Sequence, residues 1–332
     1  MFLSSVLVIP YATISPGDAR MVGNIVHVTG VPSYPPKTSV AFTTVSTADA
    51  TVLDAFRSWL DDDIEVVPTK ALRGDRSRSE SQRYNAQLMD TSKLTAETVA
   101  LRRLGLPVTI VTSGTVVRAI AEDAPAAAVL HIDDVIVAVD GEPVDQFDEL
   151  RTLLQPGGPG ATHTLTVERP AGSDTRLEVP ITTIAVPDDP TRAVIGIQPE
   201  ERIVDFRFPF QISIESGTVG GPSAGLAFAL AVLDVLTPGE LTGGHKIAVT
   251  GTVGLDGTVG PVGGGHQKAI AVRDAGYEAF VVPADEYEEV QATVGHDLRV
   301  IAVDTLQEAL DALESLGGDV ASLGPAGPTP AP

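Results

Sequence analysis

Residues 215–236 read ESGTVGGPSAGLAFALAVLDVL, a glycine-rich loop that leads into a long apolar stretch. From Ser223 to Leu236 apolar residues occupy every side of a helix, and a stretch of about fourteen residues is too short to cross a bilayer. We therefore expect a helix buried in a protein core. The apolar alternation of Gln211–Ile214 predicts a strand before the loop, so the loop joins a strand to the buried helix.

Ser223 lies where the predicted helix begins. Its hydroxyl would be near the unpaired N–H groups of the first turn, whose partial positive charge stabilises an oxyanion formed by attack on a carbonyl. Gly221 permits close approach of a substrate backbone, and Pro222 and Ala224 flank the serine. The same residues are also typical of a turn whose serine caps a helix, so the loop alone leaves both interpretations open.

A second glycine-rich stretch, residues 257–265, precedes a predicted helix at Gly265–Ala275 that carries Lys268. Ala271, Val272 and Ala275 follow Lys268 at helical spacing, which places the lysine on an apolar face. Burial disfavours the charged form and lowers the pKa of a lysine, as a general base requires. The alternative is a lysine whose stem covers apolar surface while its amine reaches water.

Taken together, these stretches resemble the proteolytic domain of Lon proteases. The resemblance rests on Gly-Pro-Ser-Ala-Gly at 221–225, Val-Thr-Gly around Thr250, and Gly-Pro-Val-Gly-Gly at 260–264 followed by Lys268. It implies that Ser223 is the nucleophile, Lys268 its base, and Thr250 a residue that orients the lysine. Gly221, Pro222 and Ala224 would support the serine.

The resemblance implies an α+β fold, with a Lon-type catalytic domain of mixed sheets and packed helices at residues 191–318. Two features depart from the ATP-dependent members. Val219 and Gly220 stand where those proteins often carry an acidic residue before the serine. The chain also has no Gly-x-x-x-x-Gly-Lys-[Ser/Thr] phosphate loop, so we expect ATP-independent proteolysis.

Residues 107–188 have short predicted strands, one short helix and glycine-rich turns. The runs Ala-Glu-Asp-Ala-Pro-Ala-Ala at 121–127 and Ile-Asp-Asp-Val-Ile-Val-Ala-Val-Asp-Gly-Glu-Pro-Val at 132–144 resemble a PDZ domain of bacterial proteases. The resemblance implies binding of an extended peptide along a sheet edge. No carboxylate-binding loop stands out near 104–107 or 112–114, and a spacer without a ligand is the alternative.

Residues 20–105 would supply a hairpin and helices that complete the proteolytic fold, with the PDZ-like domain inserted or placed before the catalytic part. Alternation over residues 24–46 around Pro32–Pro36 predicts the hairpin. Val52, Phe56 and Leu60 belong to a helical stripe that we expect to face a core. The polar residues 72–88 predict a loop, and a second helix is expected at Thr91–Leu104.

The two ends of the chain differ in composition. Residues 1–12 are mostly apolar but too few to cross a bilayer, and they form either a buried first strand or the remnant of a membrane anchor. Residues 319–332, rich in glycine and proline, predict a disordered tail.

The formal net charge of -22 excludes nucleic acid as a partner, because phosphates require a basic surface. The chain has no cysteine and six histidines without a His-x-x-x-His pair, so we expect no metal site and no cofactor.

The PDZ-plus-Lon order after an apolar N-terminus resembles bacterial peptidases held by a single membrane span, with the body outside the cytoplasm. The resemblance implies polypeptide substrates, a peptide ligand at the PDZ-like domain and a possible homo-oligomer. Two other functions compete with this interpretation. One is a noncatalytic peptide-binding protein with an inactive Lon-like domain. The other is an α/β-hydrolase-type esterase, because Gly-Pro-Ser-Ala-Gly also fits Gly-x-Ser-x-Gly, with Asp256 and either His266 or His296 downstream.

Overall fold

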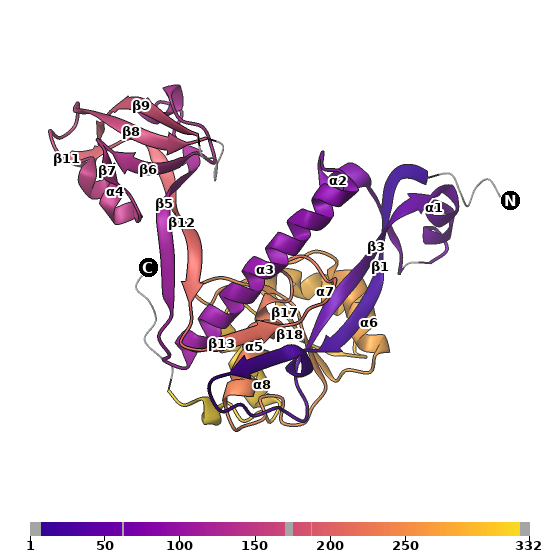
Figure 1. The fold of residues 1–332 in the computed structure, drawn as a ribbon. Coiled ribbons are helices and arrows are strands. Elements are labelled where there is room, and N and C mark those ends of the chain that lie inside the picture. The colour runs from indigo at the N-terminus through magenta and orange to yellow at the C-terminus, as the bar shows by residue number, and fades with distance from the viewer. Residues whose placement is uncertain (1–7, 62, 170–174, 187, 326–332) are drawn as a thin grey trace. The chain divides into compact units, whose positions relative to one another are not determined.

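The structure is a computed structural model that describes residues 8–61, 63–169, 175–186 and 188–325 of the 332-residue chain. The chain forms two compact units. The split unit comprises Met1–Val108 and Phe208–Pro332, and the middle unit comprises Thr109–Arg207. Helices and sheets occur together in the fold, which confirms the α+β class (Figure 1).

A six-stranded mixed sheet organises the split unit, in the order β18-β17-β14-β3-β1-β4. β18, β17, β14 and β3 run parallel, whereas β1 pairs antiparallel with β3 and β4. The strands are β1 (Val8–Met21), β3 (Ala41–Thr51), β4 (Glu65–Pro68), β14 (Ile247–Val249), β17 (Ala279–Pro283) and β18 (Arg299–Val303). Two small antiparallel pairs accompany them: β2 (Val26–Thr29) with β13 (Gln211–Ile214), and β15 (Thr252–Val253) with β16 (Val259–Gly260).

Helices cover both faces of this sheet. Successive side chains of a strand point to opposite faces, so each strand contributes to two cores. On β17, Val281 packs against the core of α5, α3 and α8, while Phe280 and Val282 pack against α6 and α7. The helices of the split unit are α1 (Val52–Ser58), α2 (Thr69–Arg73), α3 (Arg78–Arg103), α5 (Gly225–Leu236), α6 (Gly265–Asp274), α7 (Tyr287–Val294) and α8 (Leu306–Ser315), with short 3-10 turns η1 (Gly23–Ile25), η3 (Ala284–Glu286) and η4 (Ala321–Leu323).

α5 is the apolar helix expected from the sequence. Its residues from Gly225 to Val235 are all buried, as an all-round apolar helix requires. The ring of Phe228 packs on that of Phe42 from β3, with 5.8 Å between ring centroids. α5 therefore fixes the end of the glycine-rich loop against the central sheet.

The N-terminal region differs from three predictions. β2 pairs with β13 and β3 pairs with β1, so the predicted hairpin over residues 24–46 is wrong. The predicted loop at 72–88 is largely α3, which begins at Arg78 because Ser77 and Glu80 form a capping box. The apolar stripe of α1 faces solvent instead of a core.

The two ends of the chain can be compared with the predictions for residues 1–12 and 319–332. Residues 8–12 begin β1, whereas residues 1–7 lie outside the described residues. The predicted tail starts too early at residue 319, since Val320 and Leu323 are buried around η4. The rest of that tail, residues 326–332, lies outside the described residues. No helix among the described residues combines the length and apolar character that a bilayer span requires.

The middle unit contains a sheet in the order β12-β5-β6-β8-β9, with β7 beside β6, and a separate β10–β11 pair. Its elements are β5 (Thr109–Ile120), η2 (Pro125–Ala128), β6 (Val135–Val139), β7 (Glu142–Pro143), α4 (Phe147–Leu153), β8 (Thr162–Glu168), β9 (Arg176–Thr182), β10 (Ile184–Val186), β11 (Asp189–Val194) and β12 (Ile197–Arg207). β12 pairs along β5, so this unit ends at Arg207 and not near the predicted boundary of 188–191.

Candidate active site

The loop before α5 is held from two sides. On the α3 side, the Gly221 N–H donates to the Asn85 carbonyl at 2.8 Å, and the Ser92 hydroxyl donates to the Pro222 carbonyl at 3.1 Å. Gly221 has a φ of 90°, a conformation that favours glycine. On the sheet side, the Ser223 carbonyl accepts from the Gly251 N–H at 3.0 Å. These contacts fix the backbone around the serine.

Ser223 lies just before Ala224, the N-cap of α5. Of the N–H groups around it, that of Gly221 donates to Asn85 and that of Gly225 to Pro222. In the part of the chain that the structure describes, the N–H groups of Ser223 and Ala224 have no such acceptor. These two donors at a helix start are therefore free to bind an anionic oxygen.

Lys268 lies in the first turns of α6 and is 2% exposed. Its Nζ donates a hydrogen bond to Thr250 Oγ1 at 3.2 Å. Burial lowers the pKa of Lys268 to about 8, although the nearby carboxylate of Glu286 partly offsets the effect. A substantial fraction of this amine is consequently neutral near pH 7 to 8.

Glu286, in η3 after β17, is buried beside the lysine. One of its carboxylate oxygens accepts from the Val262 N–H, and Oε2 is buried without a hydrogen-bond partner among the described residues. Burial raises the pKa of Glu286, and the hydrogen bond and Lys268 oppose that rise. Both buried groups are thus shifted toward their neutral forms, because desolvation outweighs their mutual attraction.

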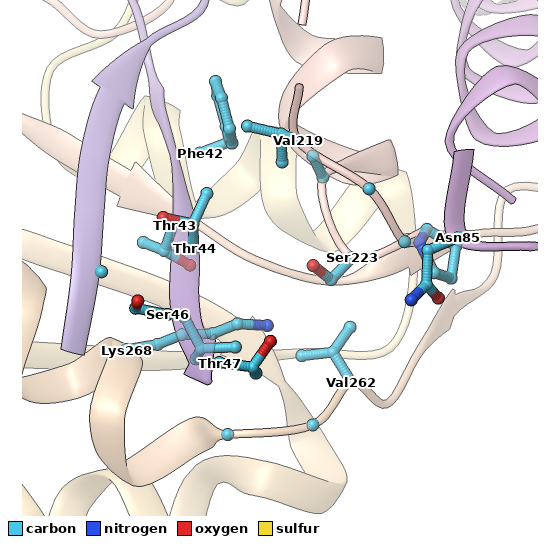
Figure 2. A pocket seen from close by; sticks show the side chains of 18 of the residues that line it. Phe42, Thr43, Thr44, Ser46, Thr47, Asn85, Val219, Ser223, Val262 and Lys268 are labelled. Atoms are coloured by element: carbon cyan, nitrogen blue, oxygen red, sulfur yellow. The ribbon is translucent and has the colours of Figure 1, made fainter. Parts of the chain in front are cut away.

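Ser223 and Lys268 point into one open cavity of about 1340 Å³ in the split unit (Figure 2). No hydrogen bond joins the two side chains among the described residues. The wall opposite Ser223 is formed by β3, whose residues Thr43–Thr47 lie beyond the last pairing with β14 at Phe42. The segment pairs with β1 on its other side, so only the edge that faces the cavity has unpaired backbone groups.

The structure brings most of the predicted site residues together. Gly221, Pro222, Ser223, Ala224 and Lys268 all line the cavity. Thr250 lies behind it, where its Oγ1 donates to the Ser223 carbonyl at 3.3 Å and accepts from the lysine.

The residues of the esterase alternative are placed elsewhere. Asp256 accepts hydrogen bonds from Thr258, and His266 Nδ1 lies 2.9 Å from Thr293 Oγ1. Asp256, His266 and His296 do not line the cavity that contains Ser223. Among the described residues, no group of three His, Cys, Asp or Glu side chains is arranged to hold a metal ion.

Sequence reasoning missed three contributors to the site: Asn85 and Ser92 on α3, and Glu286. The pair Ser77 and Glu80 signals the start of α3 and could have placed the first two residues on a helix. Glu286 gave no signal, because it meets Val262 across 24 positions of sequence.

In the middle unit, β12 is an edge strand that begins after Gly196. Gly196 has a φ of 78°, and its carbonyl accepts from the Ala121 N–H at 3.0 Å. Of the two segments considered for a carboxylate loop, residues 112–114 are inside β5, between β12 and β6. Residues 104–107 follow α3 in the split unit. β12 and β9 are the two edge strands of this sheet, so the free side of β12 is one available edge.

Two family models match the chain. The C-terminal proteolytic domain of Lon protease matches residues 209–315, and the PDZ domain matches residues 102–181. The Lon protease of Campylobacter concisus is 33% identical over 141 residues, covering 41% of this chain and 17% of that protein. The Lon protease of Halothermothrix orenii is 39% identical over 102 residues, 30% of this chain and 12% of that protein.

Lon protease 2 of Bacillus subtilis is 32% identical over 119 residues, covering 35% of this chain and 20% of that protein. The matched region thus spans a fifth or less of each of these three relatives. Among solved structures, the PDZ domain of an SdrC-like protein from Listeria monocytogenes is 25% identical and covers 27% of this chain and 92% of that domain, with a TM-score of 0.25.

The two family matches agree with the resemblances found in the sequence. Residues 102–181 of the chain therefore match a PDZ domain, and residues 209–315 match a proteolytic domain of the Lon type.

Proposed function

We propose that the chain is an ATP-independent endopeptidase in which Ser223 and Lys268 form a catalytic dyad. The observation that carries the proposal is the buried amine of Lys268, which has a lowered pKa and points into the same cavity as the Ser223 hydroxyl (Figure 2). A base that is partly neutral at working pH can accept the serine proton. ATP independence is supported by the lack of a phosphate-loop sequence in the 332 residues.

In the proposed reaction, neutral Lys268 takes the proton of Ser223 Oγ as the oxygen attacks the substrate carbonyl. The N–H groups of Ser223 and Ala224 stabilise the tetrahedral oxyanion, the protonated lysine returns its proton to the leaving amine, and water hydrolyses the acyl-enzyme. The hydrogen bond between Ser223 and Lys268 forms when substrate binds, since catalytic hydrogen bonds often tighten only in the complex.

The cavity favours an extended, unfolded polypeptide as substrate. β3 offers unpaired backbone at Thr43–Thr47, facing the loop that carries Ser223. A substrate strand that paired with this edge would have its main-chain groups satisfied while its scissile carbonyl lay near the serine. A folded chain cannot offer such a strand, so proteins that are loose or already unfolded should be preferred.

The PDZ domain would add a second site for polypeptides. The free edge of β12 can pair with an extended peptide in the manner of β-strand addition. We propose that this edge captures substrates or regulatory peptides.

We also propose that the protein works at a bacterial membrane, with its body outside the cytoplasm and attachment through the N-terminal segment. Support comes from the apolar sequence of residues 1–12 and from the resemblance to anchored peptidases that combine these two domains. Separation of cells into membrane and soluble fractions tests the location. Cross-linking of the purified protein tests whether it forms a homo-oligomer.

The dyad is tested by digestion of an unfolded model protein such as casein, without ATP, by the wild type and by Ser223→Ala, Lys268→Ala and His266→Ala variants. We expect the first two substitutions to abolish cleavage and the third to spare it. Loss of cleavage with His266→Ala would favour a histidine-based hydrolase. A wild type without activity on any unfolded substrate would favour a noncatalytic peptide-binding protein.

A further inference from the structure

α1 turns its apolar side to solvent. Val52, Phe56, Trp59 and Leu60 are 40%, 57%, 77% and 69% exposed, respectively. Their spacing of three and four residues places them on one side of the helix and its C-terminal turn. An amphipathic helix in a soluble domain normally turns such a stripe toward the core. The exposed stripe of α1 therefore indicates a surface that binds something outside the unit.

These side chains form one surface. The rings of Phe56 and Trp59 are in contact distance, with centroids 6.2 Å apart and planes tilted by 49°. Val52 lies one turn before Phe56, and Leu60 lies one turn after it. We call these four residues the α1 patch.

A second apolar element meets the α1 patch at the start of β1. Val8 is exposed and pairs with Thr51, which is the N-cap of α1. The preceding residues 1–7 read Met-Phe-Leu-Ser-Ser-Val-Leu, of which five are apolar. Val8, the residue that directly follows this apolar sequence, therefore lies beside the start of α1.

We propose that the α1 patch is a membrane-contact surface that inserts into the interfacial layer of a bilayer with a zwitterionic surface. Tryptophan, phenylalanine and leucine are the residues that helices lying in this layer use. The proposal rests on the membrane location suggested above and not on the dyad. The net charge of -22 favours a neutral lipid surface over an anionic one.

A second copy of the chain fits the α1 patch less well. A stable interface buries about 800 Å² on each partner, or about 20 to 30 residues a side. Four side chains on α1 and the turn that follows it provide far less. Asp61 and Asp63 follow Leu60, so a two-fold contact centred on this patch would bring acidic residues of both copies together.

Trp59 is the only tryptophan of the chain and reports on its own surroundings. The full chain is titrated with phosphatidylcholine vesicles, and its emission maximum and sedimentation with the vesicles are recorded. We expect a blue shift and co-sedimentation. The double variant Phe56→Ser/Leu60→Ser, which keeps Trp59, should bind at least tenfold more weakly. The control Ile132→Ser/Ile184→Ser removes two exposed apolar residues from the middle unit outside β12 and should bind as the wild type does.

Further experiments distinguish binding to a neutral bilayer from the alternatives. Vesicles with phosphatidylglycerol should bind more weakly than phosphatidylcholine vesicles. A blue shift that appears without vesicles and grows with protein concentration would assign the patch to a second copy and overturn the proposal. Vesicle binding that survives the double variant but disappears on deletion of residues 1–7 would assign binding to the N-terminal segment alone. Absence of wild-type binding would also overturn it. A Ser223→Ala variant should bind like the wild type, so the outcome is independent of peptidase activity, and circular dichroism confirms that each variant is folded.

Discussion

Lys268 donates a hydrogen bond from Nζ to Thr250 Oγ1 at 3.2 Å, and this contact orients a lysine in the cavity wall. Thr250 in turn donates to the Ser223 carbonyl, so its hydroxyl proton is already committed and its oxygen accepts from the amine. A neutral lysine held in this way keeps its lone pair for another proton. In the proposed reaction, this arrangement would leave the amine able to act as a base toward Ser223.

The pH dependence of cleavage should follow the lysine. Because burial lowers the pKa of Lys268 to about 8, the neutral fraction rises about tenfold per pH unit below that value. We expect kcat/KM on an unfolded substrate to rise with this slope between about pH 6 and 7.5 and to level off above about pH 8.5. The measurement is a pH profile with a substrate that has no titrating groups in this range. A flat profile from pH 6 to 9 would contradict a lysine base.

Replacing Lys268 by Met should stabilise the fold while abolishing activity. Below about pH 8 the amine is protonated in both folded and unfolded chains, and its burial cost is fully present. Between about pH 8 and 10.5 the folded protein releases the proton first, so the stability of the wild type rises with pH. The shift corresponds to about 3 kcal/mol.

We therefore expect Lys268→Met to raise the free energy of unfolding at pH 7 by about 1–3 kcal/mol, less whatever the lost Thr250 hydrogen bond contributed. The difference in the free energy of unfolding between Lys268→Met and the wild type should shrink toward pH 10.5. Urea unfolding at pH 7, 9 and 10.5 measures it. Lys246→Met, on an exposed lysine, serves as the control. A destabilised Lys268→Met protein at pH 7 would mean that the amine is not desolvated in solution.

Glu286 should set the position of the acid limb in the pH profile. Its carboxylate attracts the ammonium and holds the pKa of Lys268 higher than burial alone would. Glu286→Gln removes this charge yet keeps an oxygen that accepts from the Val262 N–H. The acid limb of kcat/KM should therefore move to lower pH.

The control for Glu286 is Glu289→Gln, the same change at a carboxylate that accepts from the His266 N–H. Glu289→Gln should leave the acid limb of the kcat/KM profile at the same pH as in the wild type. An unchanged limb in Glu286→Gln would show that this carboxyl acts on structure alone. Glu286→Ala, which leaves the Val262 N–H without its acceptor, should lower stability by about 1–3 kcal/mol.

The sequence predicted those helices that are marked by a pattern within a short stretch of residues. α5 and α6 follow from an all-round apolar stretch and from spacing after glycines, and they place Ser223 and Lys268 at the two sides of the cavity. The strength of this prediction came from short-range periodicity and from two motifs. Nothing in either motif specified the wall that α3 and β3 provide.

The misread elements depend on contacts between distant residues. Alternation around residues 24–46 fits a hairpin, but it does not say that β2 will pair with β13, about 180 positions away. Helical spacing in α1 identified an apolar face without saying whether that face turns to a core or to solvent. β12 was assigned to the wrong domain because its pairing with β5 joins residues about 80 positions apart.

Ser92 supplies the last prediction, because it links α3 to the loop that carries Ser223, the proposed nucleophile. Its hydroxyl donates to the Pro222 carbonyl at 3.1 Å, whereas the Gly225 N–H donates to the same carbonyl from the other side. Ser92→Ala removes one of two hydrogen bonds and should cost about 1 kcal/mol of stability. Since the Ser223 N–H and hydroxyl follow Pro222 directly, we expect a loss of about threefold to tenfold in kcat with little change in KM.

Thr95→Ala on the same helix is the matched control, because the Thr95 hydroxyl bonds to the Thr91 carbonyl within α3. It should leave kcat unchanged. Steady-state kinetics and urea unfolding of both variants measure the two effects. If Ser92→Ala lowers stability but leaves kcat at the wild-type value, the loop does not need this hydrogen bond from α3 to place Ser223. A purely structural role would lower the folded fraction without changing turnover of the folded enzyme. A fall in kcat larger than the fall in the folded fraction would instead identify Ser92 as a positioning residue.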